Sequence, residues 1–157
     1  MSHRERRAGD ARQGPLLSQY LDTSLLVSAF TREAATGRVQ SWLGRQEARD
    51  LVISDWVVTE FSSALSVKLR MKHLNLEQRA NAMALFTGPK ERSLTVVAVK
   101  REHFMAAARF AEDHGLGLRA GDALHISVAA DRGARICTLD KRLADAAAAL
   151  GVDSLSK

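Results

Sequence analysis

Four acidic residues stand where the sequence pattern predicts that their side chains meet. Asp22 and Asp140 each directly follow a short apolar segment, while Glu60 and Asp122 lie beside the apolar stripes of two predicted helices. A carboxylate near the core costs several kcal/mol unless another group compensates its charge. Hard divalent cations such as Mg²⁺ and Mn²⁺ prefer oxygen ligands of this kind. The four acids together therefore predict a metal site.

The chemistry that such a site supports is hydrolysis. A metal ion held by carboxylates can activate a water molecule and neutralise negative charge on a phosphodiester. This route needs no serine, cysteine or histidine nucleophile, and the sequence shows no convincing catalytic triad. The predicted reaction is metal-dependent cleavage of a phosphodiester bond.

Each acid taken alone also has a structural explanation. Asp22 and Asp140 precede predicted helices and can act as N-caps. Glu60 can be an acid at the edge of a helix with its carboxylate in water, and Asp122 can cap its helix or pair with Arg119. The prediction of a shared site rests on the fact that the predicted parallel sheet can bring all four acids together.

The elements that position these acids alternate along the chain. Short apolar segments predict buried strands at residues 16–21, 51–54, 94–99 and 135–139, and residues 152–155 add a candidate fifth strand. N-cap residues and apolar stripes predict a helix after Asp22-Thr23-Ser24 and helices over 34–48, 56–72, 76–86, 102–114, 120–132 and 141–150. Gly88-Pro89 is expected to end the helix that starts at residue 76. This alternation indicates an α/β fold, with a central, mainly parallel sheet of four or five strands and helices on both faces.

A parallel sheet explains how distant acids come together. Functional groups in such sheets gather at the carboxyl ends of the strands. Asp22 follows the first predicted strand and Asp140 follows the fourth. We therefore expect both carboxylates on the same rim of the sheet.

Length and charge bound the organisation of the chain. The 157 residues predict one domain. The arginine-rich residues 1–15 are predicted to form a basic, flexible tail, and residues 16–157 the single domain. The net charge of +5 and the pI near 9.9 favour an anionic partner, nucleic acid above all.

The composition also predicts the compartment. No apolar run approaches the roughly 18 residues of a membrane span, and the charged N-terminal segment lacks the apolar core of a secretion signal. A single cysteine, Cys137, cannot form an intrachain disulfide and is interpreted as a small buried apolar residue. We expect a cytoplasmic protein with no membrane partner.

Several segments resemble a known family, from about residue 19 to residue 155. They are Tyr20-Leu21-Asp22-Thr23-Ser24, Thr59-Glu60, Arg119-Ala120-Gly121-Asp122-Ala123-Leu124-His125 and Thr138-Leu139-Asp140. These segments resemble the PIN-domain signature, and the whole set resembles the VapC-type toxins of type II toxin–antitoxin pairs.

The resemblance implies a fold and an activity. The fold would be a PIN-like three-layer α/β/α sandwich, and the activity Mg²⁺-dependent endonucleolytic cleavage of RNA, with Mn²⁺ able to substitute. Asp22, Glu60, Asp122 and Asp140 match the family's acidic positions. The first, third and fourth would hold the principal metal, and Glu60 would bind a metal or orient the attacking water. The products would carry 5′-phosphate and 3′-hydroxyl ends.

Supporting residues and partners also follow from the resemblance. Thr23, Ser24 and Thr138 match hydroxyl positions that help arrange ligands or waters in the family. Arg119 matches a basic position and could contact the scissile phosphate or the antitoxin, or pair with Asp122. The implied partners are the RNA substrate, a cognate protein antitoxin and a second copy of the chain in a homodimer.

His125 has two interpretations. It lies in the matched segment, one turn after Asp122. Packing in the core is the favoured interpretation, because a magnesium site seldom uses imidazole. A role behind the metal ligands is the alternative.

Two other classes of protein compete with the nuclease. A PIN-like binding module without catalysis would only bind RNA or a protein partner, and the complete set of acids argues against it. A phosphatase or phospho-acceptor receiver would use Asp22 as a nucleophile, with Lys141 as its active-site lysine. That second class would leave Glu60 and Asp122 unexplained.

Overall fold

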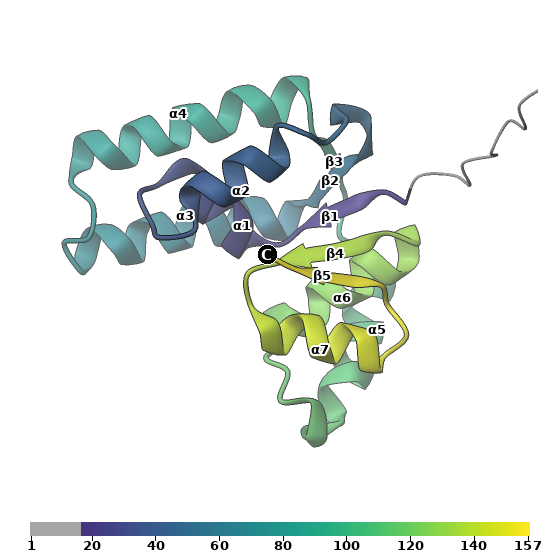
Figure 1. The fold of residues 1–157 in the computed structure, drawn as a ribbon. Coiled ribbons are helices and arrows are strands. Elements are labelled where there is room, and N and C mark those ends of the chain that lie inside the picture. The colour runs from purple at the N-terminus through teal and green to yellow at the C-terminus, as the bar shows by residue number, and fades with distance from the viewer. Residues whose placement is uncertain (1–16) are drawn as a thin grey trace, which may run out of the picture.

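The computed structural model describes residues 17–157 of the chain (Figure 1). The tail predicted over residues 1–15 lies outside the described residues.

A five-stranded, all-parallel sheet forms the centre of the fold, in the order β3-β2-β1-β4-β5. Its strands are β1 (Gln19–Leu21), β2 (Leu51–Ser54), β3 (Thr95–Val97), β4 (Arg135–Thr138) and β5 (Ser154–Ser156). Tyr20 of β1 is paired with Val52 of β2 on one side and with Ile136 of β4 on the other. The strand that precedes Asp22 is therefore the central one.

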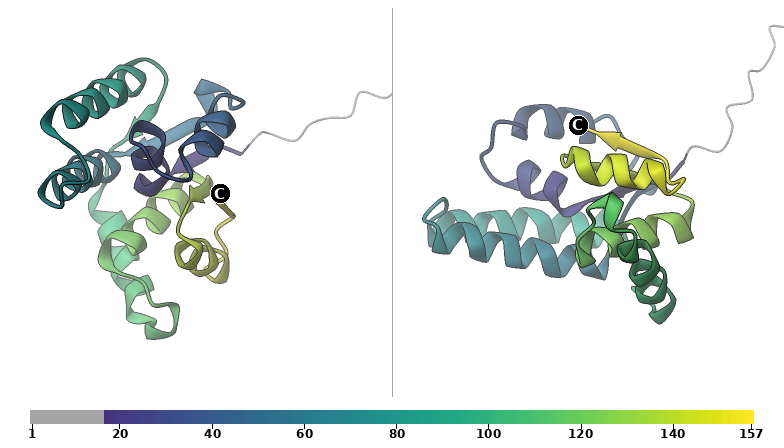
Figure 2. Two further views of the ribbon diagram at one scale, coloured as in Figure 1. Left: turned by 60° about the vertical axis from the view of Figure 1, so that its left-hand side comes forward. Right: turned by 90° about the horizontal axis from the view of Figure 1, so that it is seen from below.

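Helices cover both faces of this sheet. They are α1 (Thr23–Phe30), α2 (Thr36–Leu43), α3 (Asp55–Arg70), α4 (Leu76–Arg92), α5 (Arg101–Glu112), α6 (Ala120–Arg132) and α7 (Lys141–Ala149). Figure 2 shows the strands between two helical layers, with α2 and α7 on one side and α3 and α6 on the other. The predicted α/β/α sandwich is confirmed. Within residues 17–157, no helix combines the length and the apolar character that crossing a membrane requires.

The core explains why the central strands are apolar along their whole length. Tyr20, Ile53 and Ile136 are fully buried, because helices pack on both faces of β1, β2 and β4. Away from the sheet, the rings of Phe61 on α3 and Phe86 on α4 pack with their centroids 4.3 Å apart. These contacts fix α3 against its neighbours, and α3 is the helix that carries Glu60.

Strand β3 differs from its prediction. It was expected to be buried, but Thr95 and Val96 are exposed. The strand pairs only with β2 and lies at the edge of the sheet. The apolar, β-branched sequence predicted the strand correctly, but burial depends on its place in the strand order.

Two helix ends also differ. Helix α4 continues through Pro89 to Arg92, beyond the stop predicted at Gly88-Pro89. Proline removes one hydrogen bond, here to the carbonyl of Leu85, and that residue is 57% exposed, so water can satisfy its carbonyl group. Helix α2 ends at Leu43 instead of residue 48, because the chain tightens into a turn where Gln46 N donates to Leu43 O at 3.0 Å.

The buried thiol of Cys137 gives a first testable prediction. Its Sγ lies 3.0 Å from Gln19 Oε1 inside β4, and burial raises the pKa of the thiol to about 12. At pH 8 only about one thiol in ten thousand is then ionised. We expect a thiol-specific reagent at pH 8 to leave the native protein unlabelled and to label it at once in denaturant. Rapid labelling of the native protein would contradict the buried placement.

Candidate active site

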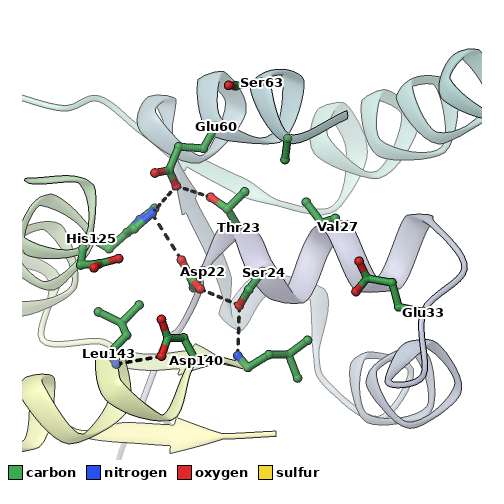
Figure 3. A pocket seen from close by; sticks show the side chains of 13 residues that line it. Asp22, Thr23, Ser24, Val27, Glu33, Glu60, Ser63, His125, Asp140 and Leu143 are labelled. Atoms are coloured by element: carbon green, nitrogen blue, oxygen red, sulfur yellow. Dashed lines mark hydrogen bonds and ion pairs between the residues drawn. The ribbon is translucent and has the colours of Figure 1, made fainter. Parts of the chain in front are cut away.

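The four predicted acids line one cleft at the carboxyl ends of the central strands. Figure 3 labels Asp22, Glu60 and Asp140 among them. Asp22 connects β1 to α1, and Asp140 connects β4 to α7. Glu60 reaches the cleft from α3, and Asp122 from the first turn of α6. Segments far apart in sequence thus supply one group of carboxylates, as the parallel topology requires.

Asp22 is held by hydroxyl groups and is only 6% exposed. Its Oδ2 accepts hydrogen bonds from Ser24 Oγ at 2.7 Å and from Thr138 Oγ1 at 2.8 Å. Although Asp22 occupies the N-cap position of α1, its side chain makes no capping hydrogen bond. Capping therefore does not explain this buried acid. The side chains of Ser24 and Thr138 point it into the cleft.

Glu60 is held from two sides. Its Oε2 accepts a hydrogen bond from Thr23 Oγ1 at 2.6 Å and lies 2.5 Å from His125 Nε2. Burial raises the pKa of the Glu60 carboxyl group. The hydrogen bond and charge of His125, together with the Thr23 hydroxyl, lower that pKa by more than burial raises it. The net pKa is below the ordinary value, so Glu60 is ionised at neutral pH.

His125, for which packing in the core was the favoured interpretation and a role behind the metal ligands the alternative, lies next to two of the acids. It is buried, 2% exposed, but its Nε2 faces both Glu60 Oε2 and Asp22 Oδ1, the latter at 3.3 Å. Burial lowers the pKa of its imidazole, but the Glu60 hydrogen bond and the charges of Asp22, Glu60 and Asp122 raise it more. Two signals in the sequence pointed to it: its place in the matched segment and its position one turn after Asp122. Its burial fits the packing interpretation, and its contacts with two acids are those that the alternative, a role behind the metal ligands, requires.

The remaining two acids are half-buried, as Glu60 is. Asp140 Oδ1 accepts the main-chain N–H of Arg142 at 2.9 Å, so this acid does cap α7. Its Oδ2 lies 3.6 Å from Arg142 Nη2. Asp122 Oδ2 accepts the main-chain N–H of Arg119 at 3.2 Å. Within the described part of the chain, residues 17–157, the Arg119 side chain forms no ion pair. The predicted alternative, a salt bridge from Arg119 to Asp122, is therefore not present there.

The oxygen and nitrogen atoms of these side chains can serve as ligands for a hard divalent cation. One atom each of Asp22, Glu60 and His125 lie within 4.8 Å of one another, and Asp122 and Asp140 line the same cleft. The set is dominated by carboxylate oxygens, which is the chemistry that Mg²⁺ and Mn²⁺ prefer.

Lys141 does not have the place that a phosphatase or receiver needs. Its Nζ binds Asp145 Oδ2 at 2.7 Å on the surface of α7, and its side chain is 80% exposed. An active-site lysine would have to face Asp22. The geometry therefore disfavours this class.

The comparisons with known proteins identify the family. Residues 19–149 match the PIN domain, and the chain belongs to the PIN-domain family. A search among curated proteins finds no match to the sequence.

Several solved structures share the fold. VapC20 of Mycobacterium tuberculosis, described as a sarcin–ricin loop cleaving toxin, has 16% identity and a TM-score of 0.68, covering 89% of this chain and all of its own. FitAcB from Neisseria gonorrhoeae has 18% identity and a TM-score of 0.64, and the match covers 88% of this chain and 96% of the FitAcB chain. VapBC2 from Rickettsia felis, bound to a promoter DNA fragment, has 16% identity and a TM-score of 0.62. The match covers 89% of this chain and 98% of the VapBC2 chain. At these identities the likeness shows the fold.

Gly121 provides a test of the site geometry. A Cβ at this position would lie 2.8 Å from Glu60 Oε1, whereas a Cβ at Gly37 in α2 would meet nothing within 4 Å. We expect Gly121→Ala to displace the Glu60 carboxylate and weaken Mn²⁺ binding about 10-fold. Thermal stability should change little, because the preference of a helix for alanine over glycine, about 1 kcal/mol, offsets part of the cost of moving Glu60. Calorimetric titration with Mn²⁺ and a thermal melt measure both quantities.

Gly37→Ala is the matched control, since it makes the same change inside a helix away from the cleft. Its affinity for Mn²⁺ should equal that of the wild type. Equal affinity in Gly121→Ala as well would show that Glu60 does not need the space that the glycine leaves.

Proposed function

We propose that this PIN-domain protein is a metal-dependent endoribonuclease and the toxin of a toxin–antitoxin pair. The observation that carries the proposal is the cleft lined by Asp22, Glu60, Asp122 and Asp140. PIN domains are nucleases, and a similar structure, VapC20, is described as a toxin that cleaves the sarcin–ricin loop. The basic net charge of +5 suits an RNA substrate.

The proposed metal is Mg²⁺, with Mn²⁺ able to replace it. Asp22, Asp122 and Asp140 would hold the principal ion, directly or through water, and Glu60 would bind a metal or orient the attacking water. When bound, the cation supplies Lewis acidity and lowers the pKa of water. Ser24 and Thr138 fix the Asp22 carboxylate, which reduces the reorganisation that ligand binding requires.

The protein side chains then determine the course of the reaction. Glu60, aligned by Thr23 and His125, is ionised and can accept a proton from the attacking water. The water oxygen forms a bond to phosphorus, the bond from phosphorus to the 3′-oxygen breaks, and the leaving 3′-oxygen takes a proton from solvent. The products carry a 5′-phosphate and a 3′-hydroxyl. The 2′-hydroxyl takes no part in this route, so a preference for RNA would come from the shape of the bound strand.

The proposed partners are RNA, a cognate antitoxin and a second copy of the chain. Support for an assembly comes from the similar structures, which include FitAB and VapBC2, each described as bound to DNA. An antitoxin would inhibit the nuclease by covering the acidic cleft.

The nuclease is tested by cleavage of total cellular RNA with the purified protein. We expect discrete fragments with Mg²⁺ or Mn²⁺ and none with EDTA. Asp22→Asn and Asp122→Asn should each lower the rate by more than about 100-fold, because even outer partners of metal ligands are worth about 10- to 100-fold. Initial rates on an end-labelled RNA measure the effect.

Asp145→Asn is the matched acid control, since Asp145 pairs with Lys141 on the exposed surface of α7. It should cleave at the wild-type rate. Cleavage that persists in Asp22→Asn would indicate a contaminating nuclease or a different site. RNA binding without turnover by folded wild-type protein would favour the binding module instead.

A further inference from the structure

A chain of buried hydrogen bonds leads from the sheet to the cleft. Ser54 Oγ lies 2.8 Å from Tyr20 Oη, and Tyr20 Oη lies 2.8 Å from His125 Nδ1. Tyr20 and Ser54 are fully buried, and His125 is 2% exposed. Buried polar groups are costly unless they are paired, so these three side chains hold one another in place.

The three residues come from three separate elements. Tyr20 lies in the central strand β1, Ser54 ends β2 and caps α3, and His125 lies in α6. Their contacts span 34 and 105 residues of sequence. The chain of hydrogen bonds therefore fixes α6 relative to β1 and to the start of the helix that carries Glu60.

The carboxylates set the order of the donors in this chain. His125 Nε2 faces oxygens of Glu60 and Asp22, which can only accept, so Nε2 must carry the proton of the neutral imidazole. The other ring nitrogen, Nδ1, then accepts, and Tyr20 Oη donates to it. Ser54 Oγ in turn donates to Tyr20 Oη.

The protonated nitrogen faces the carboxylates. His125 Nε2 lies 2.5 Å from Glu60 Oε2 and 3.3 Å from Asp22 Oδ1. A nitrogen that carries a proton has no lone pair for a metal. This nitrogen therefore donates to the carboxylates, although it lies among atoms close enough together to form a metal site.

We propose that His125 is a positioning residue whose Nε2 donates hydrogen bonds to the Glu60 and Asp22 carboxylates and does not bind the metal. Tyr20, supported by Ser54, gives it this role by donating to Nδ1. The proposal deepens the proposed function and rests on it for the metal and for RNA cleavage. It assigns to two buried residues of the core, Tyr20 and Ser54, an effect on the rate of the reaction.

Nitrogen NMR of histidine-labelled protein tests the assignment directly. Long-range ¹⁵N–¹H spectra are recorded without metal and with saturating Mg²⁺, and His125→Gln identifies the signals. We expect Nε2 to carry a proton in both states, and Tyr20→Phe to weaken the preference for that nitrogen. Loss of the Nε2 proton when Mg²⁺ is added would make His125 a ligand and overturn the proposal.

Cleavage kinetics supply the second readout. His125→Ala should lower kcat about 10- to 100-fold with little change in KM for RNA, as expected for a partner behind a metal ligand. His125→Gln should recover part of the loss, because its amide can donate a hydrogen bond. Tyr20→Phe should lower kcat about 3- to 10-fold, since the neutral hydrogen bonds to His125 and to Ser54 are both lost.

His103 provides the matched control. It is a second buried histidine, 5% exposed, hydrogen-bonded to the Lys100 main chain and to Asp131, and it does not line the cleft. His103→Gln should cleave at nearly the wild-type rate. Wild-type rates in both Tyr20→Phe and His125→Ala, with melts that show folded protein, would overturn the proposal.

The two proposals can fail separately. Wild-type protein that neither binds Mg²⁺ nor cleaves RNA would refute the proposed function, and the metal-free spectra would still decide the role of His125. A proton on Nε2 that Tyr20→Phe destabilises supports the positioning role, and an Nε2 without a proton overturns it.

Discussion

The closeness of the Asp22 and Glu60 carboxylates is the constraint on which the site depends. Two such groups repel each other, and partial burial strengthens the repulsion because the surroundings screen charge poorly. Hydrogen-bond donors around the two carboxylates reduce this repulsion. Ser24 and Thr138 donate to one acid, Thr23 donates to the other, and His125 lies between them. A cation in the cleft would complete this compensation.

The strand order places these donors around the acids. Because β1 lies between β2 and β4, the ends of both neighbours flank Asp22. Strand β4 brings Thr138 to its carboxylate, and β2 brings Ser54 to Tyr20, the residue behind His125. The edge strands β3 and β5 contribute no acid to the cleft. The central part of the sheet therefore organises the site, and the outer strands extend the scaffold.

The sequence predicted those features that depend on local pattern. Asp22 and Asp140 could be placed at strand ends, because apolar segments and caps are readable from neighbouring residues. The exposure of β3 could not be predicted, because it depends on the strand order. The contact of His125 with Glu60 spans 65 residues and exists only after α6 packs against β1 and α3. The space that Gly121 leaves for Glu60 has the same origin in tertiary packing.

Helix ends account for the different treatment of the four acids. Asp22 and Asp140 occupy the N-cap positions of α1 and α7, and Asp122 lies in the first turn of α6. The partial positive charge at a helix N-terminus favours a carboxylate there by roughly 0.3–1 kcal/mol. Glu60 lies beyond the first turn of α3, which begins at Asp55, and lacks this benefit. Glu60 receives the Thr23 hydroxyl and the closest contact with His125, so local hydrogen-bond donors stabilise the one carboxylate of the four that no helix terminus favours.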